Sequence, residues 1–561
     1  MHPKRLPLKT DGTDYNTILR ELITLILSDA DTSADVQKLK AQVCKKYALD
    51  TFPRNSEIFA AAKDDEKERL RALVQVKPSR TISGVAPVAV MTSPHKCPHG
   101  ICLPCPGGPE NPLFKSPQSY TGEEPAALRA RQLGYDPYVQ VQARLRQFEE
   151  LGHHIDKAEL IVMGGTMTAR EPEYQEWFMR ECIRAMNEYG GENRGDIFTF
   201  EELCKENESA RVRCIAVTFE TRPDWCLPEH IDRMLSLGVT KVELGVQQLD
   251  DRILEFNRRG HTVADSVYAN KCLRDAGIKV GFHVMPNLPS ATVEDDRKMF
   301  DTLFTDERFC PDFIKIYPTL VTPGSEIEQL WLKGEYRVYP EDELVDLIAY
   351  GKSKLAEYTR LQRVQRDIPA KLILAGSHYS NFRQLAKDRL LEQGGECRCI
   401  RCREAGRHVT DEEPHTKITE YKCCGGTEFF IQFTANDALI GFVRLRLPDS
   451  PWRRELLGNG VNGNNDGNEE ISGDSGGDND KPAALVRELH VYGSIVPLSE
   501  KGEGNRWQHR NFGDRLLRTA EDISRERGYT RVAVMSGIGV RPYYNKRGYI
   551  RCGPYMIKEL K

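Results

Sequence analysis

Three cysteines stand close together in the segment Cys97-Pro-His-Gly-Ile-Cys102-Leu-Pro-Cys105. Three thiolates on a short loop rich in Gly and Pro can surround one metal centre, because such a loop lets each sulfur turn inward. A four-iron cluster held by three cysteines keeps one iron free for a substrate or cofactor, whereas electron-transfer clusters usually have four. A zinc site usually has a fourth protein ligand, which His99 could provide. These residues alone leave both metal centres open.

A second cysteine group, Cys397-x-Cys399-x-x-Cys402, also has the spacing of metal ligands. A fourth ligand could come from later in the chain, from Cys423, Cys424 or His408. We expect a structural zinc ion that stabilises an otherwise irregular connector, and the alternative is a reduced thiol cluster without metal. The remaining cysteines are scattered, and we interpret them as small residues of the core.

A segment near the end of the chain has the residues of a phosphate-binding turn. It reads Gln508-His-Arg-Asn511-Phe512-Gly513-Asp514 and leads into a helical pattern. Backbone N–H groups and the dipole at a helix start bind phosphate, and the close approach requires small residues. Asn511 stands where a glycine is usual, but Asn tolerates a left-handed φ. Two neighbouring segments strengthen the prediction: the strand Glu488-Leu489-His490-Val491 and the turn beginning Tyr543-Tyr544, one of whose tyrosines we expect to be a core residue.

Residues 124–373 supply the elements that position such groups. Helical stretches alternate with short apolar runs such as AELIVMGG, RCIAVTFET and KVGFHVMPNLP. This alternation predicts a parallel βα barrel, and the number of runs favours a partial six-stranded barrel, (β/α)6, over a complete eight-stranded one. Functional groups of such barrels lie at the carboxyl ends of the strands. The candidates at those positions are Thr166, Glu220, Glu243, Gln247, His283 and Lys315, unless they are ordinary loop polarity.

The pattern divides the multidomain α/β chain into four parts. We predict a helical N-terminal region at residues 1–76 and the barrel with its cysteine loop at residues 77–380. Residues 381–425 are predicted as a basic, cysteine-bearing connector. Residues 426–561 are predicted as an α+β unit with its own core, interrupted by a disordered acidic loop at 459–480.

Composition excludes several classes of protein. The 561 residues are 39% hydrophobic and 29% charged, which suits folded cores in a chain that stays in solution. No apolar run approaches the ~18 residues of a membrane span, and the first residues lack the apolar stretch of a signal peptide. We therefore expect a cytoplasmic protein with reduced cysteines. Because the net charge is only −4, a nucleic-acid site must be a local basic patch.

The cysteine triplet in front of a βα barrel resembles the radical S-adenosylmethionine superfamily. The first long strand ends in Met163-Gly164-Gly165-Thr166, which is similar to the glycine turn that approaches the methionine amino group in that superfamily. The usual motif has three residues between the first two cysteines, whereas this chain has four. The resemblance implies a [4Fe-4S] cluster that binds S-adenosylmethionine, with Cys97, Cys102 and Cys105 as ligands and with Gly164, Gly165 and Glu220 against the cofactor.

Segments along most of the chain resemble the family of Elongator catalytic subunits, which join a radical S-adenosylmethionine domain to a GNAT acetyltransferase domain. They include KPSRTISGVAPVAVMTSP, SYTGEEPAALRARQLGYDPY, ETRPDW and RELHVYGSIVP, and the resemblance covers roughly residues 77–561. The short gap from Cys97 to Cys102 is similar to archaeal and some bacterial members. The resemblance implies that acetyl-CoA is bound by Lys157, Glu488, Leu489, His490, Val491, Asn511, Phe512, Gly513, Asp514 and Tyr544. Among these and their neighbours, it implies catalytic roles for Lys157, Tyr543 and Tyr544.

The resemblance further implies a tRNA-modifying enzyme that forms 5-carboxymethyluridine at the wobble uridine, and we expect the helical region 1–76 to contact the tRNA. Reductive cleavage of S-adenosylmethionine would give a radical that removes hydrogen from the acetyl methyl group of acetyl-CoA, and the carbon radical would add to uridine C5. Polar acetyl transfer cannot form this carbon–carbon bond. The alternatives are a protein lysine acetyltransferase with a structural iron–sulfur cluster and a non-catalytic RNA-binding scaffold.

Basic clusters predict where tRNA phosphates would bind, unless they are solvated helix faces. They are Arg360, Arg363 and Arg366; Arg398, Arg401, Arg403 and Arg407; and Lys77 with Arg80. We expect no membrane partner. The chain is expected to act without other Elongator subunits, and its sequence is compatible with a homodimer.

Overall fold

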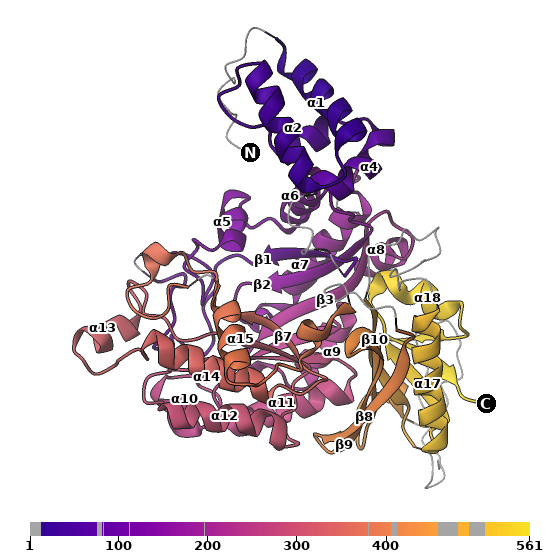
Figure 1. Ribbon diagram of the computed structural model, residues 1–561. Coiled ribbons are helices and arrows are strands. Elements are labelled where there is room, and N and C mark those ends of the chain that lie inside the picture. The colour runs from indigo at the N-terminus through magenta and orange to yellow at the C-terminus, as the bar shows by residue number, and fades with distance from the viewer. Residues whose placement is uncertain are drawn as a thin grey trace.

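The structure is a computed structural model that describes residues 13–75, 81, 83–111, 113–195, 197–379, 381–405, 412–457, 481–492 and 511–561. The expected acidic loop at 459–480 lies outside the described residues, as do Lys77, Arg80, Arg407, His408 and Gln508. The described part has three units (Figure 1). The N-terminal unit has its own buried cluster, whereas the buried cluster of the second unit continues into residues of the third, such as Leu485 and Tyr555. None of its helices is long and apolar enough to cross a membrane.

The N-terminal unit is helical, as its apolar spacing predicts. Its helices are α1 (Tyr15–Asp29), α2 (Ser33–Lys46), α3 (Asn55–Ala61) and α4 (Asp64–Val74). Asp14 caps α1, and Thr32 and Asp35 form a capping box that starts α2. The unit stands above the rest of the molecule in Figure 1. It is joined to the barrel where Arg71 donates to the carbonyl of Gly152 at 2.7 Å.

The second unit is a parallel sheet of seven strands in sequence order, open between its first and last strands over the described residues. The strands are β1 (Ala86–Met91), β2 (Lys157–Met163), β3 (Arg213–Thr221), β4 (Lys241–Gln247), β5 (Lys279–Val284), β6 (Phe313–Ile316) and β7 (Arg360–Val364). The partial barrel is confirmed, and it has seven strands rather than six. The short runs at β1 and β7 complete it, and β7 is polar enough, as Arg-Leu-Gln-Arg-Val, to have been read as a basic segment.

Helices cover the outside of this sheet. For example, α6 packs on β1, α7 on β3, α11 on β4 and β5, and α15 on β7. The helices of this unit and the following connector are α5 (Pro125–Gln132), α6 (Pro137–Glu150), α7 (Pro172–Asn187), α8 (Phe200–Asn207), α9 (Pro228–Ser236), α10 (Asp251–Phe256), α11 (Val263–Asp275), α12 (Val293–Thr305), α13 (Glu326–Leu332), α14 (Glu341–Lys354), α15 (Phe382–Glu392) and α16 (Ile400–Arg403).

The third unit is a mixed sheet in the order β13-β14-β12-β11-β10-β9-β8. Its strands are β8 (His415–Cys423), β9 (Gly426–Ala435), β10 (Ala438–Leu447), β11 (Ala484–Val491), β12 (Arg531–Met535), β13 (Ile550–Cys552) and β14 (Tyr555–Glu559), and its helices are α17 (Phe512–Glu526) and α18 (Arg541–Asn545). The expected hairpin β9–β10 turns at Asn436 and Asp437, both with positive φ, as a tight two-residue turn requires. Strand β8 lies within the expected connector 381–425 and already belongs to this sheet.

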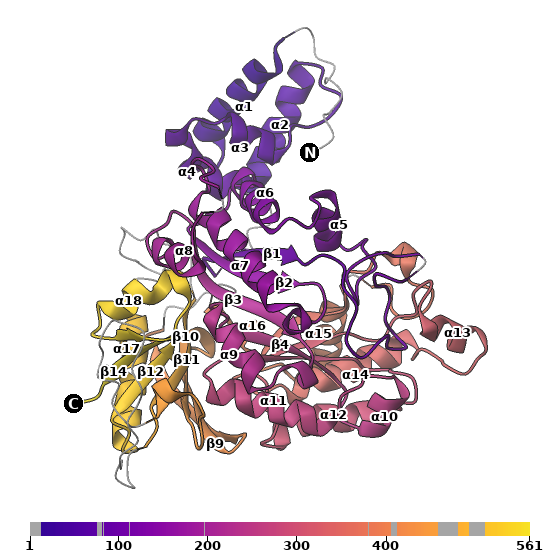
Figure 2. The same cartoon turned by 180° about the vertical axis from the view of Figure 1, so that it is seen from behind.

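The mixed sheet lies beside the barrel, on the side away from the loop that carries Cys97 and from α13 (Figures 1 and 2). It contacts the amino ends of the barrel strands: Arg487 donates to the carbonyl of Ile278, the residue before β5. The two ends of one set of parallel strands therefore face different surroundings.

Candidate functional site

A cavity of about 180 Å³ opens at the carboxyl ends of the barrel strands. Its wall includes the sulfur-bearing residues Cys97, Cys102 and Cys105, together with Gly165 after β2 and Glu220 on β3. Of the strand-end residues predicted from the sequence, the cavity is lined by Thr166, Glu220, Glu243, Gln247, His283 and Lys315. Residues far apart in the chain thus meet around one space, because parallel strands place their carboxyl ends at one edge.

Each sulfur of the first cysteine triplet, Cys97, Cys102 and Cys105, has a polar neighbour. The Cys102 sulfur lies 2.9 Å from His99 Nε2 and accepts a hydrogen bond from Arg259 at 3.1 Å. Gln118 Nε2 donates to the Cys105 sulfur at 2.9 Å, and the Cys97 sulfur lies 3.8 Å from the Thr166 hydroxyl. Burial raises the pKa of the Cys97 thiol to about 11. Without a metal, burial therefore favours the protonated form of this thiol.

The triplet fits a cluster better than a single ion. Zinc lies ~2.0–2.3 Å from its ligand atoms, so those atoms crowd closely together. Among the described residues, two groups have three ligand atoms within 4.8 Å of one another: Cys397, Cys399 and Cys402, and Glu220, Glu243 and His283. The triplet of Cys97, Cys102 and Cys105 is not such a group. Three thiols spread around one cavity wall suit a larger, iron–sulfur centre. Burial lowers the pKa of His99 to about 3, so the imidazole is a neutral neighbour of Cys102.

The Gly-Gly turn after β2 has backbone angles that require glycine. Gly164 has φ +121° and Gly165 has φ +98°. A Cβ on Gly164 would lie 2.3 Å from the Thr92 hydroxyl oxygen, and Gly165 faces the cavity. The turn therefore brings backbone, free of side chains, against the space that the three thiols surround.

Charged groups form the floor of the cavity. Glu243 is 2% exposed, lies 3.0 Å from His283 Nε2 and pairs with Lys315 and Lys241. Burial acts to raise the pKa of Glu243, but the two lysines outweigh it and hold that pKa well below its usual value. Lys315 also lies 3.4 Å from Glu220. The trio Glu220, Glu243 and His283 is compact enough for a metal ion, but the Lys315 ammonium already supplies its cation.

The structure adds cavity residues that sequence patterns do not single out. Tyr120 donates to Glu220 at 2.7 Å, and Arg366 lies over the Tyr120 ring at 5.9 Å. Gln118 and Arg259 contact the cysteine sulfurs. Tyr120 lies in the segment SYTGEEPAALRARQLGYDPY, and Gln118 lies just before it. No spacing rule relates either residue to the cysteines earlier in the loop.

A second candidate site lies where β11 and β12 diverge. These parallel strands pair only from Ala484 to Val486 of β11, while β11 continues to Val491 along β10. The side of β11 toward β12 is therefore unpaired beyond Val486 over the described residues. Helix α17 packs on β10 and β11 beside this opening. A slot between parting strands next to a helix start suits an extended chain that ends in phosphates.

The predicted residues of β11 alternate between two sides. Glu488 accepts a hydrogen bond from Arg444 at 2.8 Å, and the His490 ring stacks on Phe442 with centroids 5.9 Å apart. Leu489 and Val491 instead pack against the core beneath α17. Burial lowers the pKa of His490 to about 4, so its ring is neutral near pH 7.

The start of α17 has the geometry that the turn motif predicts. Asn511 has φ +61°, a left-handed conformation, and precedes Phe512, which is 5% exposed. Asp514 in the first turn accepts from Tyr543 at 3.0 Å and from Arg547 at 2.6 Å. A Cβ on Gly513 would lie 2.8 Å from the Tyr543 hydroxyl. The structure thus brings the helix start and the late turn together.

Tyr544 and Lys157 occupy different environments. Tyr544 is 6% exposed and packs edge-on against Tyr549, whereas its neighbour Tyr543 makes the contact with Asp514. Lys157 is the first residue of β2 and pairs in register with Arg213 of β3. Burial lowers the pKa of Lys157.

Close backbone packing joins the start of β3 to the third unit near Lys157. A Cβ on Gly539 would lie 2.5 Å from the Arg213 Cβ, and one on Gly537 only 1.9 Å from the Ile215 carbonyl oxygen. The short turn η7 (Ile538–Val540) therefore sits directly against β3, and α18 with its two tyrosines follows it. This packing places the candidate lysine of the barrel at the edge of the mixed sheet.

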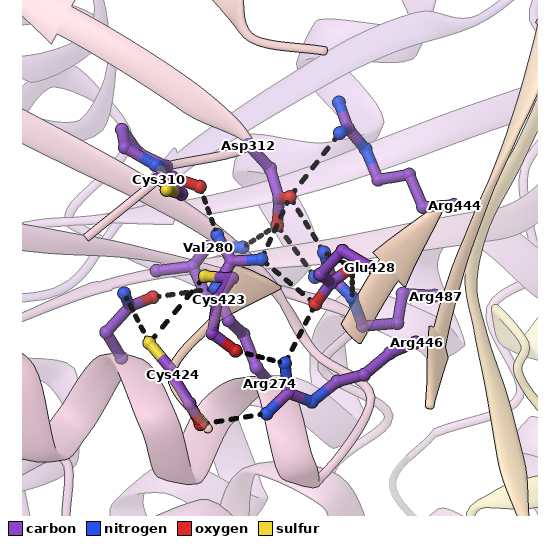
Figure 3. Close-up of polar contacts among 12 residues, drawn as sticks. Arg274, Val280, Cys310, Asp312, Cys423, Cys424, Glu428, Arg444, Arg446 and Arg487 are labelled. Atoms are coloured by element: carbon purple, nitrogen blue, oxygen red, sulfur yellow. Dashed lines mark hydrogen bonds and ion pairs between the residues drawn. The ribbon is translucent and has the colours of Figure 1, made fainter. Parts of the chain in front are cut away.

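A buried ion network fills the interface between barrel and mixed sheet (Figure 3). Asp312, before β6, accepts from Arg487 at 2.7 and 2.8 Å, and Glu428 of β9 pairs with Arg274 at 3.2 Å. Burial acts to raise the pKa of Asp312, but the surrounding arginines outweigh this effect and hold that pKa below its usual value. The members, none more than 2% exposed at the side chain, are Arg274, Asp275, Asp312, Glu428, Arg444, Arg446 and Arg487.

The second cysteine group is compact. The sulfurs of Cys397, Cys399 and Cys402 lie within 4.8 Å of one another, as single-ion ligands do. Cys423 and Cys424 are not their partners. Cys423, at the end of β8, contacts the carbonyl of Phe309, and the following Cys424 contacts the carbonyl of Arg308. That part of the fourth-ligand prediction is wrong, and His408 lies outside the described residues.

Several arginines of the predicted basic clusters make contacts within the protein. Arg360 pairs with Glu404 and Tyr492, and Arg403 donates to Gln432 at 2.9 Å in the interior. Arg398 pairs with Glu396 and Asp437. Of the predicted basic residues, Arg363 and Arg366 line the cavity. Sequence alone does not distinguish the arginines that line the cavity from those that pair within the protein, because the partners of Arg360 and Arg403 lie far away in the chain.

Comparisons with known proteins agree with this arrangement. Residues 15–82 match the ELP3 N-terminal domain, residues 91–303 the radical SAM superfamily and residues 311–392 the radical SAM C-terminal domain. The chain is 43% identical over 559 residues to a tRNA uridine(34) acetyltransferase of Methanocaldococcus infernus, covering 97% of this chain and 99% of the relative. It is 39% identical over 578 residues to Elongator complex protein 3 of Homo sapiens, covering 100% and 98%.

A solved structure extends the comparison to the fold. The archaeal Methanocaldococcus infernus Elp3 with an N-terminal deletion superposes with a TM-score of 0.71 at 40% identity, covering 86% of this chain and 100% of that one. Sequence likeness over nearly the whole chain and likeness of fold coincide. The chain therefore belongs to the Elongator complex protein 3 family of tRNA uridine(34) acetyltransferases, within the radical SAM superfamily.

Proposed function

We propose that this chain forms 5-carboxymethyluridine at the wobble uridine of tRNA from acetyl-CoA and S-adenosylmethionine, by a radical reaction. The observation that carries the proposal is that one chain holds two different sites. The carboxyl ends of the barrel strands have three thiols around a cavity, and the mixed sheet has a phosphate-type helix start beside a parted pair of strands. A simple amine acetyltransferase would need only the second.

At the first site, Cys97, Cys102 and Cys105 would hold a [4Fe-4S] cluster. Bound there, the cluster and S-adenosylmethionine would supply one-electron chemistry that protein side chains lack. Arg259 and Gln118 donate hydrogen bonds to two of the sulfurs, and such donors tune a cluster's potential. Gly164 and Gly165 leave the cavity wall free of side chains, so a cofactor can lie against their backbone. Glu220 would contact S-adenosylmethionine from the facing strand.

At the second site, the start of α17 would bind the CoA pyrophosphate with its free N–H groups. Asn511, Phe512, Gly513 and Asp514 form that start, and Glu488, Leu489, His490 and Val491 would flank the pantetheine arm. Tyr543, Tyr544 and Lys157 would lie near the acetyl group. The half-buried Lys157 would bring a cation from the barrel to a site that is otherwise built by the mixed sheet.

The tRNA would approach the cavity at the carboxyl ends of the strands. Arg363 and Arg366 line it and would contact phosphates, with binding that weakens as salt is raised. The wobble base must leave its stack to enter such a cavity. The helical unit at residues 1–76 would add a further tRNA contact. We also propose a structural zinc ion at Cys397, Cys399 and Cys402, which would fasten the connector beside β7.

The test is an anaerobic assay of the reconstituted full chain. With S-adenosylmethionine, acetyl-CoA, a reductant and tRNA, nucleoside mass spectrometry should detect carboxymethyluridine, and Cys102→Ala should form none. Cys272→Ala, a core cysteine outside both sites, is the matched control. CoA release without modified uridine, unchanged in Cys102→Ala, would contradict the proposal and favour a conventional lysine acetyltransferase. Binding of tRNA with neither product would favour a scaffold.

A further inference from the structure

One lysine is buried without any partner among the described residues. Lys352, in the last turn of α14, is 0% exposed, and no hydrogen-bond acceptor or acidic group contacts its ammonium. An isolated ammonium costs several kcal/mol to bury, so natural proteins pair such groups. Some negative charge is therefore missing around Lys352.

The other buried lysines show what a satisfied site looks like. Lys40 in the N-terminal unit contacts the Asn55 side-chain oxygen, and Lys241 in the barrel lies 2.8 Å from Glu243. Both are 4% exposed, so they are slightly less buried than Lys352. Burial alone therefore does not leave a lysine of this chain without an acceptor.

The second cysteine group lies beside Lys352. The ammonium acts electrostatically on the thiols of both Cys397 and Cys402. Helix α14 packs against α15, and the cysteine segment directly follows α15. A second cation, Arg383 on α15, acts on the same thiols and donates to the carbonyl of Leu361, with no acidic partner among the described residues.

The missing negative charge can come from the three closely spaced sulfurs beside Lys352 and Arg383. Neutral thiols are poor acceptors and carry no charge to balance an ammonium. Thiolates bound to a divalent ion keep a net negative charge, since three of them exceed the two charges of the metal, and they accept N–H hydrogen bonds. No carboxylate of the described part offers the same compensation at this place.

We propose that Lys352 is the buried counter-ion of a metal–thiolate centre at Cys397, Cys399 and Cys402. The positive charge of its ammonium balances the negative charge of the metal-bound thiolates and holds the metal in place, with the Arg383 guanidinium as a second compensating cation. Lys352 is a positioning residue rather than a ligand. The inference rests on the zinc site proposed above and assigns it a partner outside the cysteine motif.

The test measures metal retention in the full chain. Zinc is counted by elemental analysis before and after timed exposure to EDTA, because this readout is independent of the iron–sulfur cluster and of activity. Outer-sphere partners of bound metals typically contribute 10–100-fold to affinity. Lys352→Met should therefore retain zinc with about 10–100-fold lower affinity than the unchanged chain, while Lys352→Arg, which keeps the charge, should stay close to it. Lys354→Met on the same helix, whose lysine pairs with Asp301 at the surface, is the matched control.

The outcomes separate the two proposals. If the unchanged chain holds no zinc after expression with added zinc, the zinc site itself is wrong. If it holds one zinc and Lys352→Met retains it equally well, the zinc site stands and the role of Lys352 is refuted. Should Lys352→Met not fold, Lys352→Gln is compared with Lys352→Arg. Equal retention by those two would refute a charge-compensating role, and weaker retention by Lys352→Gln alone would support it.

Discussion

At the scale of single residues, the sulfur contacts explain why the front cysteine loop needs more than cysteines. Arg259 reaches Cys102 from the loop after α10, and Gln118 reaches Cys105 from a later part of the cysteine loop. Donors to cluster sulfurs and nearby positive charge stabilise the more negative, reduced state. The residues that tune such a centre are therefore separate from those that hold it.

Replacing Arg259 with Met should make the cluster harder to reduce. The change removes a hydrogen bond and a positive charge at the Cys102 sulfur, so the midpoint potential should shift to a more negative value. Redox titration followed by electron paramagnetic resonance measures it. Arg258→Met, which removes a surface arginine paired with Glu326, should leave the potential unchanged. Equal potentials for both variants would show that Arg259 does not act on the cluster.

His490 should make folding depend on pH. Burial lowers its folded-state pKa to about 4, below the ordinary value of 6.5. Between these values the unfolded chain binds a proton that the folded chain does not, so stability falls as pH drops from 6.5 toward 4. In His490→Phe, the unfolding midpoint temperature should therefore change less with pH between 6.5 and 4 than in the unchanged chain. Thermal melts at several pH values measure it. An unchanged slope in the variant would assign the pH dependence to other groups.

At the scale of elements, the start of α17 depends on one left-handed residue. Asn511 has φ +61°, where most side chains are strained by roughly 1–2 kcal/mol and glycine is not. The N–H groups at the start of α17 therefore point correctly only if residue 511 adopts the left-handed conformation. The parting of β11 from β12 then gives that helix start an open slot.

Asn511→Gly should keep acetyl-CoA binding, and Asn511→Val should weaken it. Valine is β-branched and disfavours the left-handed conformation, so holding it at this φ costs about 1–2 kcal/mol. The turn would therefore adopt the phosphate-binding conformation less often, and the Kd for acetyl-CoA should rise roughly 5–30-fold. Isothermal titration with CoA measures both variants. Equal affinities for Gly and Val at this position would mean that the turn does not bind the ligand.

At the scale of the whole molecule, the ion network makes barrel and mixed sheet one body. Its acids come from both units, and its arginines contact both. Buried charge pairs add little net stability compared with apolar packing, but losing one partner leaves the rest uncompensated. The network therefore fixes the position of the mixed sheet relative to the barrel.

Glu428→Gln should destabilise the chain by about 3–5 kcal/mol, because Arg274, Arg446 and Arg487 all lose a charged acceptor at a 0% exposed position. Denaturant melts should show a lower midpoint. Glu420→Gln on β8, whose carboxylate meets Arg527 at the surface, should change stability by less than about 1 kcal/mol. A small effect at Glu428 would mean that the interface is held by apolar packing.

The sequence alone determined the local features. Cysteine spacing, the Gly-Gly turn, the strand–helix alternation and the turn at Asn511 each depend on residues near in the chain, where periodicity and allowed φ values decide the outcome. It also indicated the family through motifs of the same local kind. The seventh strand was missed because β7 is polar, and only pairing with β6 makes it a strand.

Only the tertiary structure decided what depends on partners distant in sequence. It separated Arg363 and Arg366, at the cavity, from Arg360, which is half-buried against Glu404, and from Arg403, which is buried against Gln432. It removed Cys423 and Cys424 from the second cysteine group and placed Lys352 beside it. A side chain's charge and ligand character are local, but its burial and its neighbours are set by how the elements pack, which spacing along the chain does not encode.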